Sequence, residues 1–137
     1  MDIDFEGRKM SYYFSKTLRM PFDQAVKKVT EELKKEGFGI LTDIDVKETL
    51  KKKLNLVFQN YKILGACNPS FAFKALQMEN KIGLMLPCNV VVQETSDHEI
   101  EVAAIDPIES MLAVENPKLK EVAEEVRIKL RAVIDNL

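Results

Sequence analysis

The sequence predicts one α+β domain of two layers, with an antiparallel or mixed sheet that carries helices on one face. Its 137 residues are the length of a single domain. Hydrophobic residues make up 46% and charged residues 31%, as in ordinary globular proteins. Strand and helix patterns follow the order β-α-β-(short α)-β-α-β-β-α over 1–137, without linker composition or internal repeats.

The first half of the chain begins with a strand over 8–15, predicted from its β-favouring tyrosines and phenylalanine. Pro21 suits the first turn of a helix, and Gly37 suits its end. The apolar residues between them follow helical spacing: Phe22, Ala25, Val26, Val29 and Leu33. A strand over 38–46 follows. Asp45 and Glu48 then have capping-box spacing, which predicts a short helix over 46–54.

The second half begins with a strand over 56–67. Asn68 as N-cap and Pro69 as first residue predict a helix through about residue 79. Strands over 82–94 and 99–105 are joined by a turn over 95–98. Asn116 and Pro117 repeat the helix-start signal before a last helix. Its apolar stripe consists of Leu119, Val122, Ala123, Val126, Leu130, Val133, Ile134 and Leu137.

Charge and composition exclude several classes of protein. The net charge of −2 lacks the basic excess that nucleic-acid binding needs. The longest apolar stretch, 82–92, is half the length of a membrane helix, which needs about 20 residues. The N-terminus is acidic where a signal peptide would be basic. With two cysteines, these features predict a soluble, cytoplasmic protein.

Both cysteines precede an asparagine in apolar segments, "ILGACNPSF" and "LMLPCNVVV". Strand alternation places Cys88 on the face of Leu84, Leu86, Val90 and Val92, which predicts a small buried hydrophobe. Asn89 faces the other way. A buried amide must be hydrogen-bonded, so Asn89 either forms a pocket floor or joins its strand to a neighbouring backbone.

Cys67 directly precedes the expected N-cap, Asn68. Its sulfur could therefore lie near the positive end of the following helix, which would lower the thiol pKa and make Cys67 a candidate catalytic residue. The alternative is that Cys67 packs under this helix. The 21-residue separation from Cys88 is not a CxxC motif, and no zinc site of the usual type is predicted. A cysteine pair that binds a soft metal stays open.

Several long motifs resemble the domain-of-unknown-function 302 family: "YKILGACNPSFAFKAL", "LMLPCNVVV", "GFGILTDIDVKETLKKKL" and "AIDP" at 104–107. The resemblance covers about 10–107. It implies a two-layer α+β fold of the TATA-binding-protein-like or helix-grip kind, usually as a homodimer, and no settled activity or cofactor. DNA binding would not follow from the fold, because function belongs to sites.

Two hypotheses for function follow, beside a third, purely structural view in which both Cys-Asn segments serve only folding and dimerisation. The first is a homodimer that holds a small-molecule ligand near Cys67, Asn68, Cys88 and Asn89, without visible catalysis. The homodimer is also favoured by apolar surface at Tyr12, Tyr13 and 84–92. The alternative is a thiol-dependent redox or sulfur-handling protein that uses Cys67, with Cys88 as its partner.

Overall fold

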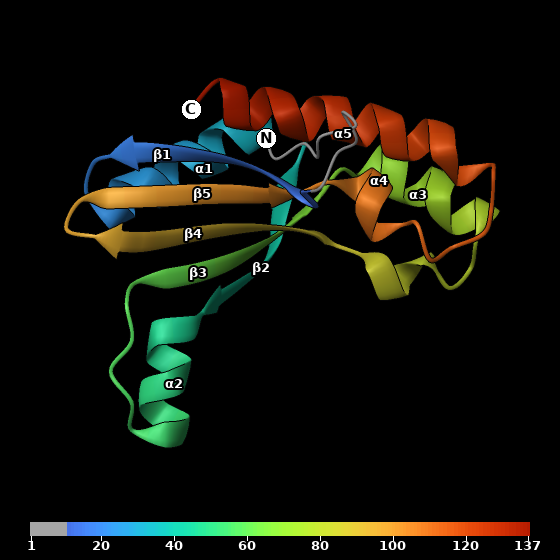
Figure 1. Cartoon of the computed structure of the whole chain (residues 1–137). Helices are drawn as coiled ribbons and strands as arrows, with labels where there is room; N and C mark the ends of the chain where they lie inside the picture. Colours follow the sequence, from blue (N-terminus) through green and yellow to red (C-terminus); the bar gives the residue numbers. More distant parts are fainter. Residues whose placement is uncertain (1–10) are drawn as a thin grey trace.

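The structure, a computed structural model, describes residues 11–137 (Figure 1). Its strands are β1 Tyr13–Arg19, β2 Gly39–Asp45, β3 Tyr61–Cys67, β4 Cys88–Ser96 and β5 Glu99–Ile105. Its helices are α1 Phe22–Lys35, α2 Val46–Leu54, α3 Pro69–Met78, the 3-10 helix η1 Ile82–Met85, α4 Pro107–Ser110 and α5 Leu119–Asp135. The predicted order of elements is confirmed, with η1 and α4 added.

The strands form one antiparallel sheet in the order β1-β5-β4-β3-β2. The predicted α+β class is confirmed, and the sheet is antiparallel rather than mixed. Helices α1 and α5 lie along one face of this sheet (Figure 1). We call the other face, which these helices leave uncovered, the open face.

The core lies between the sheet and the helices. On the sheet side its members are alternate strand residues, such as Leu64, Val90, Val92, Ile100 and Val102, each at most 1% exposed. On the helix side, the whole stripe that was predicted for the last helix is buried. The apolar residues that recur every two positions on the strands and every 3.6 positions on the helix therefore pack against each other in one layer.

Local signals define the ends of the first two helices. Gly37 has a φ of +86°, and the Phe38 N–H donates to the Leu33 carbonyl at 2.9 Å, which closes α1 as predicted. Asp45 caps α2, because its Oδ1 accepts from the Glu48 N–H at 2.9 Å. Among residues 11–137, we find no helix with the length and apolar character needed to cross a bilayer.

Two predicted strands have different bounds. The first was expected over 8–15 but begins at Tyr13 and runs to Arg19, paired throughout with β5; residues 8–10 lie outside the described part. The strand expected over 56–67 begins at Tyr61, because its partner β2 gives way to α2 just after the Asp45–Lys62 pair. Apolar residues in 56–60 therefore lie outside the sheet.

The strand predicted over 82–94 is two elements. Residues Ile82–Met85 form η1, and the strand runs from Cys88 to Ser96. Pro87 has no N–H to donate to a ladder, so pairing with β3 begins only at Cys88. Leu84 is consequently 82% exposed and does not share the buried face of Cys88, as alternation through the whole segment had suggested.

The last helix begins at Leu119, two residues after the predicted Asn-Pro start. Asn116 is therefore not the N-cap of α5, and its side chain bonds to other groups. Its Oδ1 accepts from the Lys118 N–H at 3.1 Å, and its Nδ2 donates to the Met78 carbonyl at 2.9 Å. The side chain joins the end of α3 to the turn before α5.

Candidate functional site

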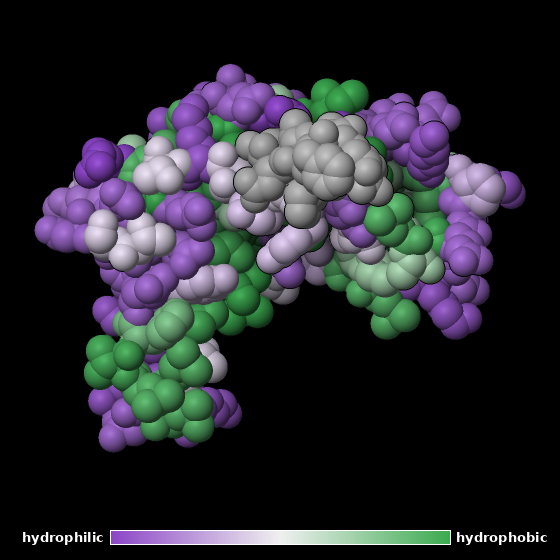
Figure 2. Space-filling view, in the orientation of Figure 1, coloured by the Kyte–Doolittle hydropathy of each residue, from purple (hydrophilic) through white to green (hydrophobic). Residues whose placement is uncertain are grey.

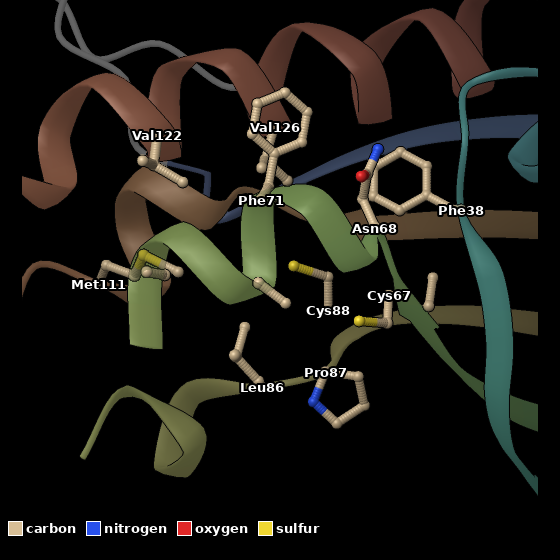
Figure 3. A pocket seen from close by; sticks show the side chains of 13 residues that line it. Phe38, Cys67, Asn68, Phe71, Leu86, Pro87, Cys88, Met111, Val122 and Val126 are labelled. Carbon is tan, nitrogen blue, oxygen red and sulfur yellow. The ribbon is translucent and has the colours of Figure 1, made fainter. Parts of the chain in front are cut away.

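A narrow pocket lies where β3 and β4 meet α3 and α5 (Figure 3). Three of the four predicted site residues line it: Cys67, Asn68 and Cys88. Cys88 lies opposite Ala66 and Cys67 follows Ala66 directly, so the two cysteines are diagonal neighbours at the ends of adjacent strands. The other walls are apolar, with Phe38, Phe71, Ala72, Ala75, Leu86, Met111, Val122 and Val126 among them.

The volume of this pocket is about 30 Å³. A cavity needs a volume of about 10–15 Å³ to hold one buried water, whereas pockets that bind organic ligands have volumes of roughly 300–1,000 Å³. The pocket therefore accommodates two or three water-sized groups and no organic molecule without displacement of its walls.

Burial raises the pKa of both thiols. The pKa of Cys67 lies above its ordinary value because the half-buried side chain loses solvent. Burial, and secondarily the charge of Cys67, raise the pKa of Cys88 to about 11. Both sulfurs are thus protonated at neutral pH, which is the opposite of the lowered pKa expected for a reactive Cys67.

Asn68 occupies the N-cap position of α3, but within the described residues its side chain makes no capping hydrogen bond. Its Nδ2 donates instead to the Glu36 carbonyl at 3.3 Å, across the turn that ends α1. A Cβ added at Gly37 would lie 3.1 Å from this Nδ2. Asn68 therefore links two helix ends, and the prediction that it caps α3 with its side chain is wrong.

Asn89 lies on the open face, away from the sulfur pocket. It pairs with Gly65 in the sheet, and its carboxamide is exposed without a hydrogen-bond partner among residues 11–137. The expected buried amide is therefore not observed. The two Cys-Asn segments are neighbours in the sheet, yet Asn89 does not share the environment of the thiols.

Two hollows on the open face meet at Asn89. The larger measures about 360 Å³ and the smaller about 290 Å³, and Asn89 and Ile105 line both. The larger is further lined by Tyr12, Tyr13, Tyr61, Val91, Gln93, Glu101, Ala103 and Ala104. The smaller is further lined by Leu84, Met85, Leu86, Pro87 and Ser110. We call the two together the Asn89 groove.

The polar groups of the Asn89 groove are partly fixed in place. Gln93 donates from Nε2 to the Glu101 carboxylate at 3.1 Å and accepts from Gln59 at 2.8 Å. The rings of Tyr12 and Tyr13 form an edge-on pair with centroids 5.2 Å apart. Sequence reasoning missed Tyr61, Gln93 and Glu101, because their proximity depends on strand order. Each of the three lies in a different strand, at an alternate position that faces away from the core. This alternation is the sequence signal that could have identified them.

The described residues contain no group of three or more His, Cys, Asp or Glu placed to hold a metal ion. His98 lies in the β4–β5 turn, within the turn predicted over 95–98, and has a φ of +57°.

Comparison with known proteins extends the resemblance in the sequence. A family model described as "Domain of unknown function DUF302" matches residues 14–137. The fold is similar to the crystal structure of an uncharacterized conserved DUF302 protein from Bacillus stearothermophilus, with a TM-score of 0.83 and 29% identity. That similarity covers 90% of this chain and 96% of the other. No curated protein matches the sequence.

Proposed function

Because the chain belongs to the DUF302 family, whose function is unknown, we propose its function from its own surface: a homodimeric domain that binds a small organic ligand beside Asn89. The single observation that carries the proposal is the carboxamide of Asn89, which has no hydrogen-bond partner among residues 11–137 and lies at the junction of two hollows. Such a position combines space, apolar walls and a polar group that is available to a ligand.

The lining of the Asn89 groove indicates the class of ligand. Tyr12, Tyr13 and Tyr61 offer aromatic surface, and Val91 and Ile105 offer aliphatic surface. The Asn89 carboxamide can donate and accept at the same time. Glu101, already oriented by Gln93, adds an acceptor. This chemistry suits a flat, largely apolar molecule that carries a hydrogen-bond donor beside an acceptor.

We assign binding rather than catalysis to the groove. The side chains of Asn89 and Gln93 are carboxamides, which donate and accept hydrogen bonds but carry no titratable proton. The Glu101 carboxylate is engaged by Gln93 at 3.1 Å. The polar groups of this surface are therefore suited to orienting a ligand.

The second copy is proposed from the surface around the groove. Helix α2 has no buried residue, although apolar side chains lie on it and on the chain that follows. The exposed members are Leu54, Leu56, Val57 and Phe58, with Val57 at 87%. Figure 2 shows hydrophobic surface over α2 and over the lobe that contains η1, with a hollow between them. A partner copy that covers these surfaces would turn the open groove into an enclosed site.

The ligand is tested on protein purified from its own cells. After denaturation, the released small molecules are measured by mass spectrometry. We expect one compound at close to one per protomer, and about tenfold less from Asn89→Leu, which loses the hydrogen bonds of the carboxamide. The matched control is Asn80→Leu, an exposed asparagine outside the groove. Equal release from wild type and Asn89→Leu, or no compound at all, would contradict the proposal.

The dimer is tested by sedimentation velocity at tens of micromolar. Wild type should sediment as a dimer and Val57→Asp as a monomer, since a buried charge without a partner is costly. Ile128→Asp, on the exposed face of α5, is the control and should stay dimeric. A monomeric wild type removes the second copy from the proposal.

A further inference from the structure

We propose that Cys67 and Cys88 together bind one monovalent soft metal ion, Cu(I), in the narrow pocket between the sheet and α3. This site is distinct from the Asn89 groove and does not depend on the function proposed above. It uses the thiols that the groove leaves unassigned.

The sheet brings the two thiols to one place. Cys88 is the first residue of β4 and lies opposite Ala66, while Cys67 is the last residue of β3. Both cysteines line the same pocket (Figure 3).

The size of the pocket selects the kind of ligand. About 30 Å³ is enough for a single ion and far below what an organic molecule needs. Apart from Asn68, the residues around the thiols are apolar, including Phe71, Leu86 and Val126. Such walls offer few additional ligands, which favours an ion that accepts low coordination.

The chemistry of the donors selects the metal. Thiolates are soft ligands that prefer Cu(I), whereas Zn(II) sites are nearly always tetrahedral with four ligands. Within residues 11–137 no third His, Cys, Asp or Glu joins the two cysteines. On binding, each thiol transfers its proton to water as its sulfur–copper bond forms. The product is a two-coordinate bis-thiolate with one net negative charge, and the oxidation state of copper does not change.

The surroundings offset that net charge. Helix α3 begins at Pro69, two residues after Cys67, so its positive dipole end lies beside the site. Cys67 is half-buried, which leaves a solvent-facing side by which an ion can reach Cys88. Cys88 is 7% exposed and would hold the ion from the interior.

The experiment is an anaerobic titration of the reduced protein with Cu(I), in competition with the chelator bathocuproine disulfonate. We expect one Cu(I) per chain, and a loss of affinity of at least about 100-fold in Cys67→Ser and in Cys88→Ser. Zn(II), titrated against a chromophoric chelator, should bind at least about 100-fold more weakly than Cu(I). Far-UV circular dichroism checks that each variant is folded.

A second variant tests the pocket rather than the thiols. Ala72→Leu places a larger side chain on the pocket wall and keeps both cysteines, so it should weaken Cu(I) binding by about tenfold or more. Ala113→Leu, at an exposed position outside the pocket, is the matched control and should bind as wild type does. The inference is overturned by substoichiometric binding, by full affinity in either serine variant, by equal affinity for Zn(II), or by unchanged binding in Ala72→Leu.

Discussion

Arg127 donates from Nε to Oδ2 of Asp106 at 3.2 Å, and joins α5 to the end of β5. The Asp106 carboxylate is 1% exposed and also caps α4, since its Oδ1 accepts from the Ile108 N–H at 3.0 Å. The "AIDP" segment therefore contains an ion pair whose carboxylate is buried. It joins the helical layer to the sheet at the end of β5.

We expect Asp106→Ala to lower the free energy of unfolding by roughly 3 kcal/mol, since a buried pair loses one partner and α4 loses its cap. Asp106→Asn keeps the cap and should lose less. Urea denaturation measures both. Asp97→Ala, at a side chain that is 95% exposed, is the control and should change stability by less than about 0.5 kcal/mol. An Asp106→Ala variant as stable as this control would contradict the role given to the pair.

Gly65 is required by close packing on the open face. An added Cβ would collide with Thr42 Oγ1 and lie 2.7 Å from Pro87 Cγ. We expect Gly65→Ala to cost about 1–3 kcal/mol, measured by urea denaturation, with partial recovery when Thr42→Ala is added. Gly39→Ala is the matched control in β2, because an added Cβ there meets nothing within 4 Å. Equal costs for the two glycines would show that backbone freedom, not packing, explains Gly65.

The role of Asn68 can be separated from capping by a substitution to aspartate. Aspartate is as good an N-cap as asparagine, but it cannot donate to the Glu36 carbonyl. We therefore expect Asn68→Asp to lose about 1–2 kcal/mol in chemical denaturation. Asp45→Asn in α2 exchanges a true capping side chain and should be nearly neutral. A neutral Asn68→Asp would restore the capping interpretation.

The raised pKa of Cys88 predicts a dependence of stability on pH in the metal-free protein. The Cys88 thiol has its ordinary pKa of 9.0 in the unfolded chain and a pKa of about 11 in the folded protein. The protonated Cys88 thiol therefore contributes its full stabilisation of the folded state below pH 9. This contribution is lost as the pH rises from about 9 to 11. The loss amounts to about 2–3 kcal/mol. Urea denaturation across this range should show wild type losing stability relative to Cys88→Ala; parallel curves would contradict the shift.

Thiol reactivity provides a further test. Since burial raises the pKa of Cys67, the Cys88→Ala variant should react with iodoacetamide at pH 7 more slowly than free cysteine does. The Cys67→Ala variant, which keeps the more deeply buried Cys88, should react more slowly still. Mass spectrometry follows both rates. A Cys67 that outpaces free cysteine would favour the thiol-dependent redox hypothesis that the sequence suggested.

Much of the helical layer follows from local sequence. The spacing of apolar residues in α1 and α5, the glycine after α1 and the aspartate before α2 each act within a few residues. Their physical causes are hydrogen bonds and side-chain contacts between near neighbours in the chain. For that reason the sequence by itself determined these helices, the α+β class and the family.

The candidate sites were decided by tertiary structure. Alternation through 82–94 placed Leu84 with Cys88, but Pro87 divides the segment and resets which residues face the core. Whether Cys67 meets Cys88, and whether Asn89 does, depends on the register of β3 against β4. Register depends on contacts between residues distant in the chain, and a shift of one position exchanges the two faces of a strand. Only the folded sheet could therefore bring both cysteines to one pocket and place Asn89 on the face opposite Cys88.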